Sequence, residues 1–153
     1  MPEPDPAASK PSVNGDGIEA KLKHLDFIQG AIARMSTSSF LFKGWAITIA
    51  AGLSAFAATS TTGVLRVALI GAILSSVLFW GLDGYYLWIE RRYVALYNKV
   101  AAQRPDEIDF SMQTDKSHPA CAWFKTCLRP HLWVFYGAII VGEAVGLGLI
   151  KGK

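Results

Sequence analysis

The sequence predicts an all-α membrane protein with three transmembrane helices, a cytoplasmic N-terminus and a short cytoplasmic amphipathic helical hairpin. Its composition is the first reason: 52% of the residues are hydrophobic and only 18% are charged, whereas about a quarter are charged in a typical soluble domain. The distribution of charge is the second, because long apolar blocks contain almost none and the charged residues crowd around them, as they do around membrane spans. A chain of 153 residues has room for about one domain.

The chain begins with a polar region and continues with an amphipathic one. Residues 1–17 hold four of the seven prolines together with small polar residues, a composition typical of a disordered tail. Residues 18–36 are predicted to form a cytoplasmic amphipathic helix, because apolar residues recur there at steps of three and four. These residues are Ile18, Leu22, Leu25, Ile28, Ile32 and Met35.

Two membrane spans follow, over residues 40–58 and 64–88, separated by a cluster of Thr, Ser and Gly that is typical of a tight turn. Helices of ~20 residues cross a hydrocarbon core of ~30 Å, and both ranges are long enough to do so. The apolar stripe continues over 89–103, which we interpret as a cytoplasmic extension of the second span ending before Pro105. The second span and its extension therefore form one long helix.

The remainder of the chain contains a third span. Residues 104–130 are predicted to be a cytoplasmic loop and interfacial segment, and 131–150 a transmembrane helix interrupted only by Glu143. The amphipathic segments 18–36 and 89–103 leave the membrane from adjacent ends of one hairpin. Each has an apolar stripe to bury, so we expect them to pack against each other.

Lysine and arginine predict the orientation. Twelve of the fifteen lie before residue 44 or between residues 89 and 130, and the other three are Arg66, Lys151 and Lys153. Because basic residues favour the cytoplasmic side, the N-terminus and the 89–130 segment are predicted to be cytoplasmic and the C-terminus external.

Four charged residues lie in or at the ends of the spans, where an ionised group at the bilayer centre costs at least ~2.5–3.5 kcal/mol. Lys43 and Asp83 both lie near the cytoplasmic boundary, where we expect them to pair or each to reach the interface. Glu143 lies deeper, and the side chain of Arg66 is long enough to approach it. Structural pairing between spans, an ion or proton pathway, an oligomer contact and a protonated Glu143 remain as alternatives.

Small residues recur every four positions on the spans. Ala138, Gly142 and Gly146 form such a stripe on the third span, and the pairs Ala51/Ala55 and Ser54/Ala58 do so on the first. Helices in lipid associate by close packing, so these stripes predict faces that meet another helix, either within the chain or in a second copy. A small stripe is a poor lipid-facing surface, which favours a homo-oligomer.

Other functional classes have little support. His118, Cys121, Cys127 and His131 are of the right types for zinc, but the cysteines are farther apart than the usual two to four residues, which favours an interfacial anchor over a metal site. No catalytic motif is present, so neither enzyme activity nor a cofactor is expected. The net charge of +3 is not gathered into one patch, which argues against nucleic-acid binding.

Three strings carry a resemblance. HLDFIQGAIARMSTSSFLFKGWAITI (24–49), FWGLDGYYLWIERRYVALYNKV (79–100) and DFSM (109–112) resemble a widespread family of small, uncharacterised bacterial inner-membrane proteins, with FLFKGWAIT and LDGYYL-ER as the most specific parts. The resemblance implies a bacterial inner-membrane location and no particular activity. The general plan is also similar to membrane effectors of bacterial anti-phage signalling systems, a likeness of architecture alone.

These observations predict a non-enzymatic, multi-pass inner-membrane protein that self-associates in the lipid bilayer. Its cytoplasmic helices are expected to take up a protein partner or a small-molecule signal. The alternative is a small ion or proton transporter or channel that uses Glu143 and Arg66.

Overall fold

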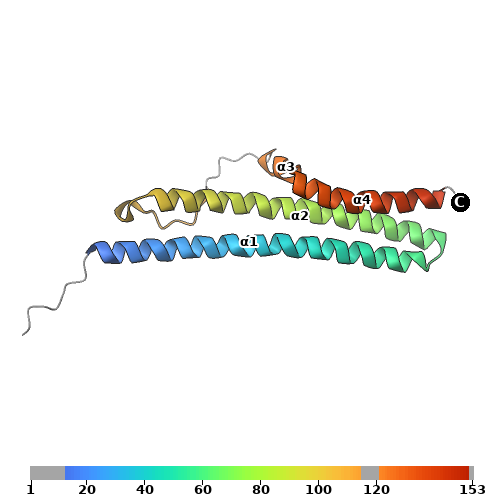
Figure 1. Cartoon of the computed structure of the whole chain (residues 1–153), viewed down its shortest axis with the longest axis horizontal. Coiled ribbons are helices and arrows are strands. Elements are labelled where there is room, and N and C mark those ends of the chain that lie inside the picture. The colour runs from blue at the N-terminus through green and yellow to red at the C-terminus, as the bar shows by residue number, and fades with distance from the viewer. Residues whose placement is uncertain (1–12, 115–120, 152–153) are drawn as a thin grey trace, which may run out of the picture.

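A computed structural model describes residues 13–114 and 121–151, which form helices and connecting segments without a strand. Two long helices, α1 (Val13–Ala58) and α2 (Thr62–Ala102), run side by side as a hairpin along their whole length (Figure 1). A 3-10 turn, η1 (Pro105–Glu107), follows α2. The short helix α3 (Cys121–Cys127) then leads to α4 (Pro130–Lys151), which lies along the half of α2 nearest the α1–α2 turn.

Three of these helices, α1, α2 and α4, are long and apolar enough to cross a membrane. The all-α fold and the three apolar helices are therefore confirmed. α4 has 22 residues and is about 33 Å long at ~1.5 Å per residue, close to the thickness of a hydrocarbon core. α1 has 46 residues and is about 69 Å long by the same rise, so it extends far beyond such a core.

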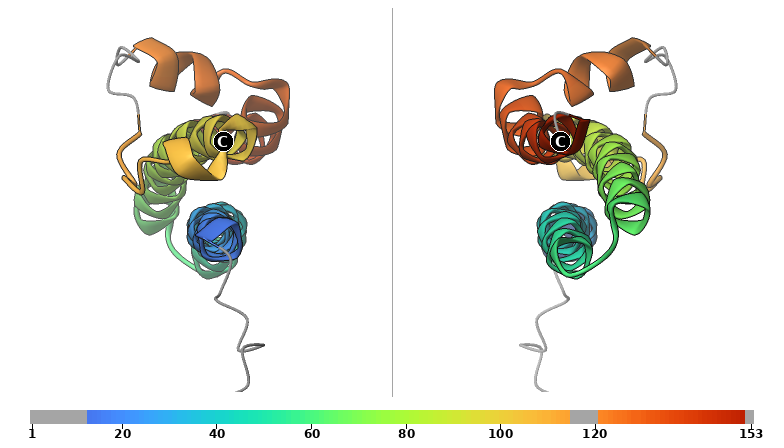
Figure 2. Two further views of the ribbon diagram at one scale, coloured as in Figure 1. Left: turned by 90° about the vertical axis from the view of Figure 1, so that its left-hand side faces the viewer. Right: turned by 90° about the vertical axis from the view of Figure 1, so that its right-hand side faces the viewer.

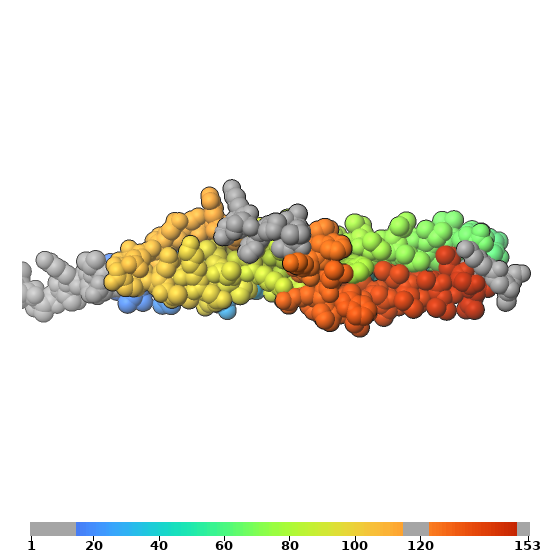
Figure 3. Space-filling model, turned by 90° about the horizontal axis from the view of Figure 1, so that it is seen from above, coloured from blue at the N-terminus to red at the C-terminus, as the bar shows by residue number. Residues whose placement is uncertain are grey.

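The molecule consequently has a three-helix part and a two-helix part. Figure 3 shows α4, in orange to red, beside the first part of α2 in green, whereas the yellow end of α2 extends past it. We call residues 13–36 of α1 and 89–102 of α2 the two-helix extension. Viewed end on, α2 and α4 lie between α1 and α3, and α4 packs mainly on α2 (Figure 2).

α1 is one continuous helix, so the prediction of two separate helices over 18–36 and 40–58 is wrong. The residues between these ranges are serine and threonine, which usually compete with helical hydrogen bonding. Here the hydroxyl groups of Thr37 and Ser38 donate to the carbonyl oxygens of Ala33 and Arg34, at 2.9 and 3.0 Å. Bonding to the residue four positions earlier leaves the backbone helical.

The start of α1 also differs from the prediction. The helix begins at Val13, inside the range 1–17 that was expected to be a disordered tail, while residues 1–12 of that range lie outside the described residues. The buried face of this part of α1 also differs from the predicted apolar stripe. Ile18 and Leu22 belong to that stripe but are exposed, whereas His24 lies outside it and is buried.

α2 covers the predicted transmembrane helix 64–88 and continues without interruption through the predicted extension 89–103 as far as Ala102, because Gln103 already has extended backbone. Its C-terminal end is bound by a side chain from the start of α1. The ammonium group of Lys21 donates to the carbonyl oxygens of Ala101 and Gln103, at 2.9 and 2.6 Å. These carbonyls have no partner within the helix, so a cation is favourable there.

The predicted loop and interfacial segment 104–130 contains η1 and α3, and its residues 115–120 lie outside the described residues. Two tryptophans attach α3 to α2: Trp80 donates its indole N–H to the carbonyl oxygen of Cys127 at 2.9 Å, and Trp123 donates to that of Gly81 at 3.3 Å. The third predicted span, 131–150, corresponds to α4.

Candidate functional site

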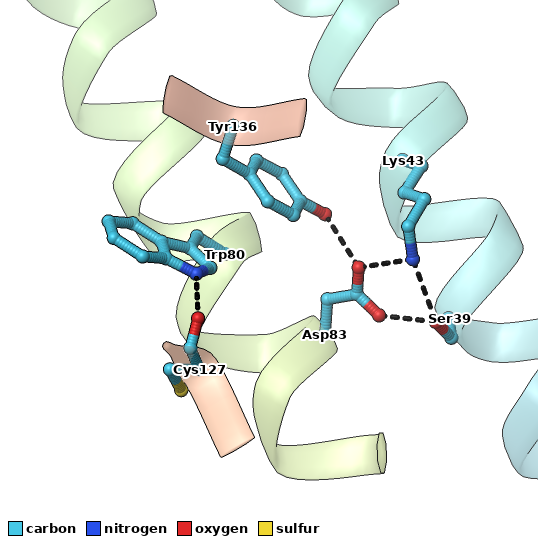
Figure 4. Close-up of polar contacts among 6 residues, drawn as sticks. All are labelled: Ser39, Lys43, Trp80, Asp83, Cys127 and Tyr136. Carbon is cyan, nitrogen blue, oxygen red and sulfur yellow. Dashed lines mark hydrogen bonds and ion pairs between the residues drawn. The ribbon is translucent and has the colours of Figure 1, made fainter. Parts of the chain in front are cut away.

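A polar cluster lies where α1, α2 and α4 meet, centred on Asp83 of α2 (Figure 4). The Asp83 side chain is fully buried and accepts three hydrogen bonds. Lys43 Nζ lies 2.5 Å from Oδ2, the Tyr136 hydroxyl donates to the same oxygen at 3.2 Å, and the Ser39 hydroxyl donates to Oδ1. Of the two arrangements that the sequence left open, the structure has Lys43 and Asp83 as a direct ion pair.

Helical spacing positions the two α1 donors. Ser39 and Lys43 are four residues apart and therefore lie on the same face, where Lys43 Nζ also donates to the Ser39 hydroxyl at 3.0 Å. Tyr136 enters from α4 and is fully buried against Leu132 and Ala46. The carboxylate of Asp83 is thus bound by side chains from both neighbouring helices.

The cluster compensates a charge that would otherwise be costly to bury. An isolated ionised carboxylate in an apolar interior is strongly unfavourable, but each oxygen of Asp83 has a donor and one donor is cationic, which is the favourable case for a buried pair. The side chain of Lys43 is 25% exposed, whereas that of Asp83 is fully buried. Because both oxygens of Asp83 are already hydrogen-bonded to side chains of α1 and α4, the arrangement suits holding three helices in register more than proton transfer.

Next to this cluster, α3 approaches α2 at a glycine. A Cβ atom on Gly84 would overlap the sulfur of Cys127 and lie 3.4 Å from its Cα. Burial raises the pKa of the Cys127 thiol above its ordinary value, and a neutral thiol is a poor metal ligand.

The other residues of the considered zinc set do not change this description. His131 is exposed, whereas His118 and the side chain of Cys121 lie outside the described residues. Among the residues that are described, no three potential metal ligands come together.

Glu143 forms a second polar contact, between α4 and α1. The Ser54 hydroxyl lies 2.8 Å from Glu143 Oε1 and 3.0 Å from Oε2, and the Glu143 side chain is largely buried. The prediction that Arg66 reaches Glu143 is wrong: Arg66 is exposed near the start of α2, and Ser54 supplies the hydrogen bond. The reason is that Glu143 lies on the face of α4 that meets α1.

The two polar contacts lie at different levels of the three-helix part. Glu143 comes seven residues after Tyr136 on α4, and Ser76 comes seven residues before Asp83 on the antiparallel α2. Both steps correspond to about 10 Å along a helix, so Glu143 and Ser76 lie at a similar level. Ser76 is fully buried, and its hydroxyl has no hydrogen-bond partner among the described residues.

The predicted small-residue stripe on α4 is divided between two environments. Gly146 packs within the chain, where its Cβ position lies 3.5 Å from Leu69 of α2. Ala138 and Gly142 are exposed, and nothing lies within 4 Å of the Cβ position of Gly142. α1 has a further row of exposed small residues on one face, comprising Gly44, Thr48, Ala51, Gly52 and Ala55.

Sequence reasoning missed two members of the Asp83 cluster. Ser39 could have been predicted as a member, because it lies four residues before Lys43 and so shares its helical face. Tyr136 had none, because the sequence does not determine the level at which α4 packs against α2.

Comparison with known proteins adds no family to this description. No family model, curated protein or solved structure matches the chain.

Proposed function

We propose that the protein is a non-enzymatic, self-associating protein of the bacterial inner membrane that couples a cytoplasmic helical module to its membrane spans. The two-helix extension would be the cytoplasmic module, and a protein partner or small-molecule signal would act on it. The proposal agrees with the excess of basic residues in the N-terminal region and in the 89–130 segment.

The observation that carries the proposal is the continuity of α1 and α2 through the Asp83 cluster. Both helices run without a break from the extension into the apolar part, and the cluster connects them to α4 near the level where α4 begins. A rigid helix transmits a displacement along its length, and a shared buried contact makes neighbouring helices respond together.

Self-association is supported by the exposed small residues of α1. Gly44 and Gly52 have nothing within 4 Å of their Cβ positions, although they lie in the apolar part of the helix. Small residues let two helices approach closely in lipid, where close packing drives association. This face is available to a second copy.

Oligomeric state in mild detergent tests the proposal. Light scattering coupled to size exclusion should show an oligomer. Gly52→Leu should shift it towards monomer, because the added side chain meets nothing within its own chain and so obstructs only the contact with a second copy. Ala144→Leu, on another exposed part of a span, is the matched control and should leave the oligomer intact. A strict monomer for the unaltered protein would contradict self-association.

One observation favours the transport alternative as a second function. Glu143 is largely buried within a span, and the hydroxyl of Ser76, which has no hydrogen-bond partner among the described residues, lies at a similar level. The Asp83 cluster lies about 10 Å further along the helices, so buried polar groups occupy two depths of the spans, as a polar pathway requires. In proteoliposomes carrying a pH-sensitive dye, this function predicts a proton flux that Glu143→Gln lowers at least about tenfold. Absence of flux, or flux unchanged by the substitution, would contradict it.

A further inference from the structure

A segment without helical structure lies over the two-helix extension after η1. Phe110 and Met112 face α1, whereas Asp109, Ser111 and Gln113 line the α2 side, the alternation expected of extended backbone. The segment satisfies some of its own backbone groups, because Ser111 N–H donates to Asp109 Oδ1 at 3.1 Å and Gln113 N–H donates to Ser111 Oγ at 3.2 Å. Its Phe110 side therefore remains available to form one wall of a groove.

The groove between α1 and this segment has a volume of about 560 Å³, within the range of small-molecule sites. Phe27 of α1 and Phe110 form much of its apolar surface, and both side chains are more than half exposed. Aromatic side chains contribute large contact areas and bind flat rings by stacked or edge-to-face contacts.

His24 gives this groove an unsatisfied polar group. The residue lines the groove, is only 5% exposed and meets Phe110 edge to face, with 5.5 Å between ring centroids. Within the described part of the chain, its Nε2 atom has no hydrogen-bond partner. Buried polar atoms nearly always have one, so an orphan beside a cavity points to a ligand that supplies it.

The charges around the groove favour an anion. Lys23 and Arg34 contribute two positive charges to its lining, and Asp26 contributes one negative charge. All three residues are exposed on α1, whereas His24 is buried. The charged groups therefore lie at the rim of the groove, and His24 lies deeper, among its apolar residues.

We propose that this groove binds a small aromatic acid. Its ring would lie against Phe27 and Phe110, and its anionic group would bind His24 Nε2 with Lys23 and Arg34 nearby. The site is inferred from its own geometry, and only its role as the signal of the cytoplasmic module rests on the function proposed above.

Binding of 4-(trifluoromethyl)benzoate to the full-length protein in nanodiscs tests the proposal by ¹⁹F NMR. We expect saturable binding that empty nanodiscs do not show, and weaker binding of the uncharged 4-(trifluoromethyl)benzamide. Gly30→Leu should weaken benzoate binding at least about tenfold, because Gly30 lines the groove and its Cβ position has nothing within 4 Å. The control is Ala33→Leu, because Ala33 is exposed and lies outside the groove lining. This variant should bind the benzoate as tightly as the unaltered protein does.

His24→Gln should weaken binding about three- to tenfold, the effect of one hydrogen bond. The methionine methyl resonances of the unaltered protein provide a test that does not depend on the folding of any variant. The protein has three methionines, and on titration the methyl resonance of Met112 in the groove should shift while that of Met35 on α1 stays in place.

Three results would overturn the proposal: no saturable binding, equal binding by the Gly30→Leu variant, or an unmoved Met112 resonance at saturation. A Met112 shift that depends on protein concentration without the probe would also overturn it, because a second copy would then occupy the groove. Since the experiment measures binding and not oligomeric state, its failure would leave the proposed function standing.

Discussion

At the scale of single residues, the decisive interaction is the buried pair of Lys43 and Asp83. Its value lies in the penalty for breaking it, because a charge left without its partner in an apolar interior destabilises a protein by about 3–5 kcal/mol. The exposed Arg66 belongs to a different class, since surface charges contribute about 0–1 kcal/mol.

We therefore expect Lys43→Ala to lower the free energy of unfolding by about 3–5 kcal/mol, measured by denaturation in detergent micelles. Adding Asp83→Ala should recover part of that loss, because the second change removes the uncompensated carboxylate. Arg66→Ala is the control and should change stability by less than about 1 kcal/mol. If the losses of the two single variants simply add in the double variant, the pair does not stabilise the protein.

The sequence could predict the pair but not the whole cluster. Lys43 and Asp83 are rare charges at the ends of two spans joined by a short turn, so hairpin geometry alone places them at a similar level. The contribution of Tyr136 depends on how α4 slides along α2, which no short turn constrains. Glu143 illustrates the same limit: its level on α4 was predictable, but the face it presents to Ser54 was not.

At the scale of helices, the contact between Lys21 and the end of α2 holds the two helices of the extension together at their far end. Lys21 binds two terminal carbonyl oxygens of α2, so it joins the start of one long helix to the end of the other. Such a contact can be removed without disturbing the apolar interior.

We expect Lys21→Met to increase hydrogen exchange in the last turn of α2 and in residues 104–114. The loss of two charge-assisted bonds at an exposed helix end should cost about 1 kcal/mol locally, or roughly a fivefold faster exchange. Lys23→Met is the matched control, because Lys23 is exposed nearby and donates to neither carbonyl. Equal protection in both variants would show that Lys21 does not hold the helix end.

The unbroken helix α1 was not predictable from residue preferences. Three serines and one threonine over 36–39 normally indicate a helix boundary, because their hydroxyls bind nearby backbone groups in other conformations. Packing along α2 outweighs that preference, and Thr37 and Ser38 bond within the helix instead. Local residue preference was thus sufficient to predict α2 and α4, in which the apolar pattern is unbroken. For α1 it wrongly indicated a break at residues 36–39.

At the scale of the whole molecule, the question is whether the extension and the three-helix part respond together. Ala31 lies in the extension and is 5% exposed, so a larger side chain there must displace the groups packed around it. Because α1 and α2 are continuous, a displacement at Ala31 should reach the Asp83 cluster and loosen the contact of Tyr136.

We accordingly expect Ala31→Leu to raise hydrogen exchange in the first turns of α4, including residues 132–138, by about fivefold, the equivalent of 1 kcal/mol. Ala33→Leu adds the same side chain at an exposed position of α1 and should leave these amides unchanged. An effect confined to the extension would mean that the two parts move independently. The extension would then be a passive stalk, and a signal bound there would have no route to the membrane spans through α1 and α2.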